Sequence, residues 1–273
     1  MRIIRNHQRR GGFFFDNASV TNKLIVVNVL LFVFFYFFSS FFGAGFFETN
    51  IALTPSLIFA GKSLWTFFTS MFMHAGLFHL FANMFSLFFI GNFLEKIIGR
   101  KRLFLIYILS GLSGGIFFVL SGLIFSNDIP GVGASGAIFG LLGILSVLVP
   151  YSKIYLIAGP LIVILAQVVL IPIIPANFAV ILNIFLNILI FGMIFAMFSF
   201  NPNFRKFAIP IELRMWLLPI VAIVPLVIID FIGVDLPIGN SAHIGGLVVG
   251  LAYGFYLRKK FPNKTRMLSR HFQ

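Results

Sequence analysis

Residues 131–149 read GVGASGAIFGLLGILSVLV, and this stretch decides how the rest of the chain is interpreted. From Ser135 to Val149 it carries no charge, and Pro150 closes the run. A run this apolar, although short, predicts a helix inside a bilayer. The residues just before Ser135 are rich in glycine, and non-helical backbone at membrane depth is tolerated only where it is buried in protein or lines a watery cavity. We therefore expect Ser135 to open a helix beside non-helical backbone that is buried in protein or lines a watery cavity.

Apolar runs of this kind recur along the whole chain. Of its 273 residues 60% are hydrophobic, 39 are Phe and only 10% are charged, whereas a soluble domain carries about 25% charged residues. This composition excludes a soluble enzyme, a disordered chain and a nucleic-acid-binding domain, despite a formal net charge of +13. We predict an all-α polytopic membrane bundle whose eight spans are Leu24–Phe42, Phe78–Leu94, Leu103–Phe125, Ser135–Val149, Ile154–Ile174, Phe178–Phe200, Met215–Ile232 and Ser241–Leu257.

The basic residues predict the orientation of these spans. With the N-terminus inside, every Lys and Arg except Lys62 falls on the inner side, as the positive-inside rule requires. We therefore expect a basic cytosolic N-terminal tail (1–23), a transmembrane domain (24–257) and a basic cytosolic C-terminal tail (258–273). The charges are read as topological anchors, so no nucleic-acid partner is expected. A prokaryotic plasma membrane is the simplest setting, with a mitochondrial or Golgi membrane left open.

Four polar residues are expected at one depth. His79 and Asn83 share a face of the second run at i and i+4, Ser135 opens the fourth, and His243 begins the eighth. Counting from the basic residues at about 1.5 Å per residue puts all four roughly 20 to 27 Å from the inner face. The hydrocarbon core is about 30 Å thick, so they lie just below the outer surface. Polar side chains inside a span indicate a functional site by default.

Two glycine pairs indicate how these spans approach one another. Gly136 and Gly140 are four residues apart in the fourth run, and Gly246 and Gly250 are four apart in the eighth. Small residues let helix backbones pack closely, so we expect Ser135 and His243 to reach hydrogen-bond distance. The free N–H groups at the start of the fourth run favour an oxyanion there.

At these residues the chain resembles the rhomboid family of intramembrane serine proteases. Three patches carry the resemblance in order: His74-Ala-Gly-Leu-Phe-His79-Leu-Phe-Ala-Asn83, Gly133-Ala-Ser-Gly136, and Ala242-His-Ile-Gly-Gly246 with Gly250. The resemblance implies a Ser135–His243 dyad without an acidic third member. It also implies an oxyanion hole made by His79, Asn83 and the Ser135 N–H, an aromatic position at Phe139 that stacks on the base, and a less defined role for His74.

The chain departs from the family pattern at two places. Trp65 is followed by Thr66, where the family often has Arg. Three apolar runs, instead of one, separate the serine and histidine helices, so residues 153–205 are interpreted as an inserted two-helix hairpin that turns at Pro175-Ala-Asn177. An inserted pair is even, so it preserves the direction of the last helix and with it the depth of His243.

The function implied by the resemblance is cleavage of single-span membrane proteins within or near the outer end of their transmembrane segment. The expected partners are such substrates and the lipid bilayer, and the oligomeric state is left open. No cofactor is expected, and no metal, because the chain contains no His-Glu-x-x-His. Two alternatives remain: a catalytically inactive relative that binds membrane clients, and a transporter that uses Gln167, Asn183 and Asn187.

Overall fold

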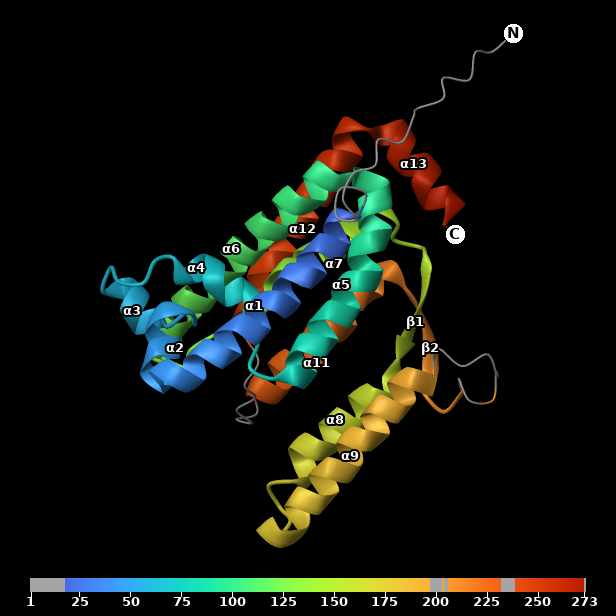
Figure 1. The fold of residues 1–273 in the computed structure, drawn as a ribbon. Coiled ribbons are helices and arrows are strands. Elements are labelled where there is room, and N and C mark those ends of the chain that lie inside the picture. The colour runs from blue at the N-terminus through green and yellow to red at the C-terminus, as the bar shows by residue number, and fades with distance from the viewer. Residues whose placement is uncertain (1–17, 197–202, 204–205, 232–238, 273) are drawn as a thin grey trace.

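The structure is a computed structural model, and it describes residues 18–196, 203, 206–231 and 239–272 (Figure 1). Six helices form the main bundle: α1 (Val20–Phe42), α5 (Leu77–Ile98), α6 (Arg100–Phe125), α7 (Ser135–Leu148), α11 (Leu218–Phe231) and α12 (Asn240–Lys260). Most of the expected N-terminal tail lies outside the described residues. Its last residues, from Val20, already belong to α1.

Helix α7 is the centre of the bundle. Of its 14 residues, all but Ser135 and Phe139 are buried, and it packs against α5, α6, α11 and α12. Its residues after Ser135 are glycine, alanine, aliphatic residues, one serine and Phe139, and all of them except Phe139 are buried within the protein. We call the end of the bundle where α7 and α12 begin the site end, and the opposite end, where Lys96, Arg100 and Arg258 lie, the basic end.

The connection from α1 to α5 folds over the site end. It contains α2 (Ala44–Asn50), α3 (Pro55–Phe59), α4 (Thr66–Thr69) and the 3-10 turn η1 (Ser70–Phe72). The Asp128 carboxylate accepts the Ser56 N–H at 2.7 Å, and the Trp65 indole donates to the Asn50 carbonyl at 3.0 Å. Thr66 is buried, and its hydroxyl donates to the Ser63 carbonyl at 2.7 Å. The connection is therefore an ordered cap.

The segment between α7 and α11 differs from the prediction. Residues Ile154–Ile174 were expected to form one spanning helix, but Lys153–Ile157 form strand β1, which pairs antiparallel with β2 (Pro210–Arg214). Helix α8 is only Ala158–Leu170, and α9 follows at Ala176–Ala196. Ile154, Tyr155 and Ile157 are of residue types enriched in strands, and Pro160 delays the helix because its ring is tolerated only in a first turn. The short 3-10 turn η2 (Met215–Leu217) then leads into α11.

The α8–α9 hairpin lies beside the bundle and extends past its site end (Figure 1). Aromatic side chains connect it to the bundle. The Phe191 ring centroid lies 5.7 Å from that of Phe78 and 5.6 Å from that of Phe81, both on α5. The chain turns between the two helices at residues 171–175, slightly before the expected turn at Pro175-Ala-Asn177, because Ala176 and Asn177 already belong to α9. That the segment is an insertion into a six-helix core stays a prediction.

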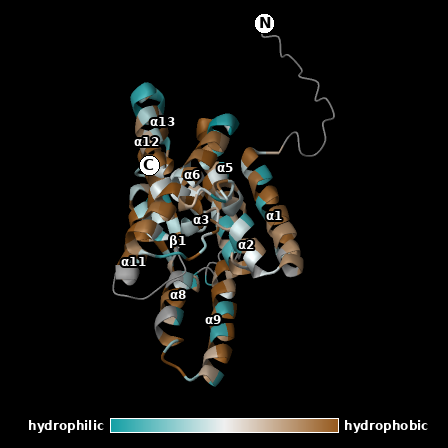
Figure 2. Cartoon of the chain, turned by 90° about the vertical axis from the view of Figure 1, so that its left-hand side faces the viewer, coloured by the Kyte–Doolittle hydropathy of each residue, from teal (hydrophilic) through white to brown (hydrophobic). Residues whose placement is uncertain are grey.

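Eight helices occupy the eight expected positions in the part of the chain that the structure describes. Four of them, α1, α5, α6 and α9, are long and apolar enough to cross a membrane, and α7, α8 and α11 are shorter apolar helices. Figure 2 shows hydrophobic colouring along the outward surfaces of these helices, where a soluble protein would carry charges. The chain is therefore a helical membrane protein, while the count of eight spans stays a prediction.

Most of the segment expected to be a basic cytosolic C-terminal tail is helical and packs on the bundle. α12 continues to Lys260, and α13 (Pro262–His271) folds back at the basic end (Figure 1). The Phe272 ring lies 5.1 Å from Phe93 of α5. The helix itself was not predicted, although Leu268 and Phe272 follow Phe261 at helical spacing and give the segment an apolar face.

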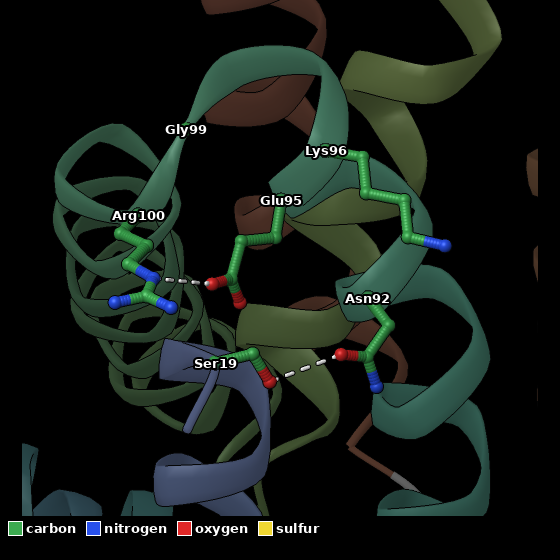
Figure 3. Close-up of a pocket in the computed structure, with 6 residues that line it drawn as sticks. All are labelled: Ser19, Asn92, Glu95, Lys96, Gly99 and Arg100. Carbon is green, nitrogen blue, oxygen red and sulfur yellow. Dashed lines mark hydrogen bonds and ion pairs between the residues drawn. The ribbon is translucent and has the colours of Figure 1, made fainter. Parts of the chain in front are cut away.

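A buried carboxylate holds α1 against the rest of the bundle at the basic end. Glu95 accepts the Val20 N–H at 3.0 Å, and the Thr21 N–H and hydroxyl each at 2.8 Å, while the Arg100 side chain approaches at 3.5 Å. Figure 3 shows Glu95 between α1 and the start of α6. The carboxylate therefore caps the N-terminus of α1 from another helix.

Candidate active site

Ser135 and His243 meet at the site end of the bundle. Ser135 is the first residue of α7, His243 lies in the first turn of α12, and the Ser135 Oγ is 2.9 Å from the His243 Nε2. His243 is buried, and its Nδ1 has no hydrogen-bond partner within the described residues. The pair is therefore a hydroxyl and an imidazole with no carboxylate on the far nitrogen among those residues.

Glycines permit this contact. A Cβ added at Gly246 would overlap the Gly136 carbonyl, and one added at Gly250 would overlap the Gly140 carbonyl. The four glycines predicted to pack helices therefore lie where the backbones of α7 and α12 touch. A larger residue would push the two helices apart, and the Ser135–His243 distance would grow with them.

Helix α6 forms a third wall that the sequence analysis missed. A Cβ at Gly114 would lie 2.8 Å from the Ala242 carbonyl oxygen and 3.4 Å from Gly136 Cα. The Ser113 hydroxyl donates to the Gly245 carbonyl at 2.9 Å. The run Ser110-Gly-Leu-Ser-Gly-Gly115 carries the same small-residue signal as the other two helices and could have predicted this contact.

Phe139 fixes the plane of the imidazole. It lies one turn after Ser135, and its ring stacks on His243 with centroids 4.3 Å apart and an interplanar angle of 18°. Stacked rings of this kind restrain rotation about the His243 side chain. The stacking supplies an orientation that a hydrogen bond to Nδ1 would otherwise supply.

His79 approaches the same point from α5. Its Nδ1 accepts a long hydrogen bond from the Ala75 N–H at 3.4 Å, which leaves its Nε2 as the donor nitrogen. A Cβ at Gly133 would lie 3.1 Å from this Nε2 and 3.7 Å from the Ser135 Oγ. Gly133 has a φ of 137°, a conformation that favours glycine, and its N–H donates to the Ser70 carbonyl at 2.8 Å.

Asn83 lies one turn along α5 from His79. It is buried, and its amide nitrogen donates to the His79 carbonyl at 2.9 Å. An amide nitrogen carries two hydrogens, so this bond leaves one donor for another acceptor. The shared face predicted from the i, i+4 spacing is thus present as a direct contact.

His74 packs between His79 and Phe32 of α1. Its ring centroid is 5.1 Å from that of His79 and 6.4 Å from that of Phe32. It is 1% exposed, and neither ring nitrogen has a hydrogen-bond partner within the described residues. Burial, with a smaller contribution from His79, lowers the pKa of His74 to about 3, so the ring is neutral at physiological pH.

The described residues contain no cluster of metal-ligating side chains. Within them, no three His, Cys, Asp or Glu side chains come close enough together to share a metal ion. The polar groups that the structure brings together at the site are the serine, the imidazoles, the amide and the backbone N–H groups at the start of α7. The amide of Ser135 has no intrahelical partner because it belongs to the first turn.

Comparison with known proteins places the chain in a family. A family model described as the Rhomboid domain matches residues 61–185 and 186–260. RHOMBOID-like protein 1 of Arabidopsis thaliana is 47% identical over 92 residues, which are 34% of this chain and 23% of that protein. Two further relatives from the same plant are RHOMBOID-like protein 6, mitochondrial (42% over 92 residues; 34% and 29% of the two chains) and Inactive RHOMBOID-like protein 8 (44% over 80 residues; 29% and 22%).

The aligned part is less than a third of each relative, so these names do not transfer an activity. The family model, in contrast, matches most of the chain and includes Ser135, His79, Asn83 and His243. The chain belongs to the rhomboid family.

Proposed function

We propose that this protein is an intramembrane serine endopeptidase that uses Ser135 as nucleophile and His243 as general base. The observation that carries the proposal is the 2.9 Å contact between the Ser135 Oγ and the His243 Nε2 inside a helical membrane bundle. A serine hydroxyl is a weak nucleophile until a base within hydrogen-bond reach removes its proton. A purely structural serine has no need of an imidazole held by three close-packed helices.

The reaction proceeds in two halves. His243 takes the proton of Ser135 as the Oγ attacks a peptide carbonyl, and the protonated imidazole then gives that proton to the leaving amine. Water next attacks the acyl-enzyme, losing its proton to His243, and the proton returns to Ser135 as the acid product leaves. The proton is thus carried by one ring nitrogen, Nε2, throughout.

The developing oxyanion is stabilised by donors on two helices. The His79 Nε2–H and the second Asn83 amide hydrogen come from α5, and the Ser135 N–H comes from α7. Donors that are already in place cost no reorganisation when the charge develops, and removing one such donor typically lowers kcat by about 100- to 1,000-fold. His74 supports this group indirectly, because a neutral ring behind His79 fills space without competing for the oxyanion.

The proposed substrates are single-span membrane proteins, cut near the end of their helix that lies at the site end. A helical carbonyl is hydrogen-bonded and shielded, so it must leave its helix before Ser135 can attack it. We therefore expect small or helix-weakening residues at the cleavage site. The lipid bilayer is then the medium that brings enzyme and substrate together.

One experiment tests the nucleophile. The full chain and its Ser135→Ala variant are reconstituted with a model single-span substrate, and the products are resolved by mass spectrometry. Cleavage by the wild type alone is the expected result, and equal cleavage by both proteins removes Ser135 from its role. A fluorophosphonate probe supplies an independent readout, because labelling should require both Ser135 and His243.

A client-binding protein without activity is the second candidate. It is favoured by the relative that is named Inactive RHOMBOID-like protein 8. The retained serine and histidine at 2.9 Å argue for catalysis in this chain. Substrate that co-purifies with the wild type without being cut, together with no fluorophosphonate labelling, is the result that would establish this alternative.

The basic end is proposed to face the cytosol, by the positive-inside rule. The three plant relatives, one of them named mitochondrial, do not favour the prokaryotic plasma membrane over an organelle membrane. Cysteine labelling decides the orientation cleanly, because the chain has no native Cys. A membrane-impermeant maleimide applied from outside should label Lys62→Cys and leave Lys259→Cys unlabelled.

A further inference from the structure

Three cations gather around one aromatic ring at the junction of α12 and α13. Phe261 joins the two helices, and the Arg102 Cζ, Lys260 Nζ and Lys264 Nζ lie 5.7, 5.8 and 6.0 Å from its ring centroid. They come from α6, α12 and α13, and all three are exposed. Among the residues that the structure describes, none of the three forms an ion pair.

Three positive charges this close together would be stabilised by a bound anion. The ring faces attract cations, and the Lys260 Nζ also donates to the Tyr256 hydroxyl at 2.7 Å. The three cations nevertheless repel one another, and neither the aromatic rings nor this hydroxyl carries a negative charge. Glu95, an acidic residue at the basic end, already accepts a hydrogen bond from the N-terminus of α1 and forms an ion pair with Arg100. The positive charge at the junction is therefore uncompensated by described protein groups.

The outward face of α13 extends this charge. Phe261, Leu268 and Phe272 pack against the bundle, whereas Arg266 and Arg270 point outward together with Met267, which is 72% exposed. Figure 2 shows hydrophilic colouring gathered at this end of α12 and α13. A helix with basic residues around an exposed apolar side chain is typical of segments that lie at a membrane surface.

We propose that this surface, the cationic hinge of Arg102, Lys260 and Lys264 with the outward face of α13, binds the phosphate groups of anionic phospholipids. Charge complementarity selects the occupant. The apolar part of α12 ends at Leu257, so the hinge begins where the chain leaves the hydrocarbon and headgroup phosphates begin. Arginine and lysine at that level are attracted to an anionic leaflet. The inference is independent of the protease proposal.

A single attachment point can report the contact. Because the chain has no Cys, Met267→Cys provides one site for an environment-sensitive fluorophore on the full-length protein. The labelled protein is reconstituted in vesicles of phosphatidylcholine alone and in mixtures with phosphatidylglycerol. We expect a blue shift and stronger emission in the anionic vesicles, and a return toward the neutral-lipid spectrum at high salt, because salt screens the attraction. Identical spectra in both lipids would overturn the proposal.

Two charge variants and one control locate the effect. Replacing Arg102, Lys260 and Lys264 by Gln should abolish the lipid dependence, and Arg266→Gln with Arg270→Gln should weaken it. The double variant alters only outward side chains, so it remains informative if the triple variant is misfolded by circular dichroism. Lys62→Gln, at the site end, should leave the dependence intact. Lipid dependence that survives in both hinge and α13 variants would also overturn the proposal.

Discussion

Helices α7 and α9 are equally apolar, yet they are used in opposite ways. α7 is buried along almost its whole length, whereas α9 is exposed at most positions and touches the bundle through Phe191. The difference lies in small residues. α7 carries Gly136, Gly140 and Gly143, each against a neighbouring backbone or side chain, while the single glycine of α9, Gly192, has no atom within 4 Å of a built Cβ. Apolarity places a helix in the membrane, and glycines decide which helices close together.

The largest effect is expected when a glycine is enlarged in the α7–α12 pair and, for comparison, in the α8–α9 pair. Gly246→Val should abolish cleavage and fluorophosphonate labelling, because its Cβ would overlap the Gly136 carbonyl, which is backbone and cannot move aside. We expect a loss of at least about 100-fold in kcat/KM, since displacement of a catalytic group by about 1 Å costs that much.

The matched control is Gly192→Ala in α9. Nothing lies within 4 Å of the added Cβ, so activity should be unchanged and the helix should gain about 0.5–1 kcal/mol. Both variants are measured with the same model substrate and by thermal unfolding in detergent. Equal activity of Gly246→Val and wild type would contradict the close contact between α7 and α12.

Glu95 is the next largest expected effect, and it tests how a hydrogen-bonded carboxylate holds α1 beside the contact between Gly91 of α5 and Thr21. Glu95→Gln removes the charge that accepts three hydrogen bonds from Val20 and Thr21. Hydrogen bonds to a charged group contribute about 1.5–3 kcal/mol, so unfolding stability should fall by roughly that amount. Glu48→Gln is the control, because Glu48 is exposed. An equal melting temperature for wild type and Glu95→Gln would show that the cap contributes nothing.

Phe139 gives a smaller effect that is confined to the site. Phe139→Ala removes the ring that stacks on His243, and aromatic pairs contribute about 0.5–1.5 kcal/mol. We expect kcat to fall by roughly 2- to 12-fold with little change in KM, because the ring orients the base and does not touch substrate. Phe139→Tyr should retain most of the activity. A change confined to KM would instead place Phe139 in substrate binding.

The polar residues of the site were predictable because apolar runs make them rare. Ser135, His79, Asn83 and His243 stood out at one depth, and the glycine spacing indicated which helices would bring Ser135 and His243 together. Strand β1 could not be predicted in the same way, because Ile154–Ile157 are apolar in a strand and in a helix alike. The strand forms because it pairs with β2, which lies more than 50 residues away in the sequence, and no local pattern indicates that pairing.

Two other features, the Glu95 cap on α1 and the packing of α13, could be recognised only from the tertiary structure. Glu95 sits among basic residues at the end of a span, where a charge is unremarkable, and its partners Val20 and Thr21 lie in the segment expected to be the cytosolic N-terminal tail. α13 was read as a tail because its basic residues dominate its composition. Its packing depends on Phe93, which no local pattern links to Phe272.

The smallest expected effect is in the hairpin, and it sharpens the contrast with α7. The Gln167 amide donates to the Asn183 Oδ1 at 2.9 Å and reaches the Asn187 Oδ1 at 3.4 Å, so α8 and α9 are joined by side-chain amides where α7 and α12 are joined by backbone contact. Interhelical hydrogen bonds in membranes average about 0.6 kcal/mol. Gln167→Leu should therefore lower stability by about that much and leave kcat unchanged. Loss of activity in this variant, with the fold intact, would mean that the hairpin takes part in substrate handling and is more than an appended pair of helices.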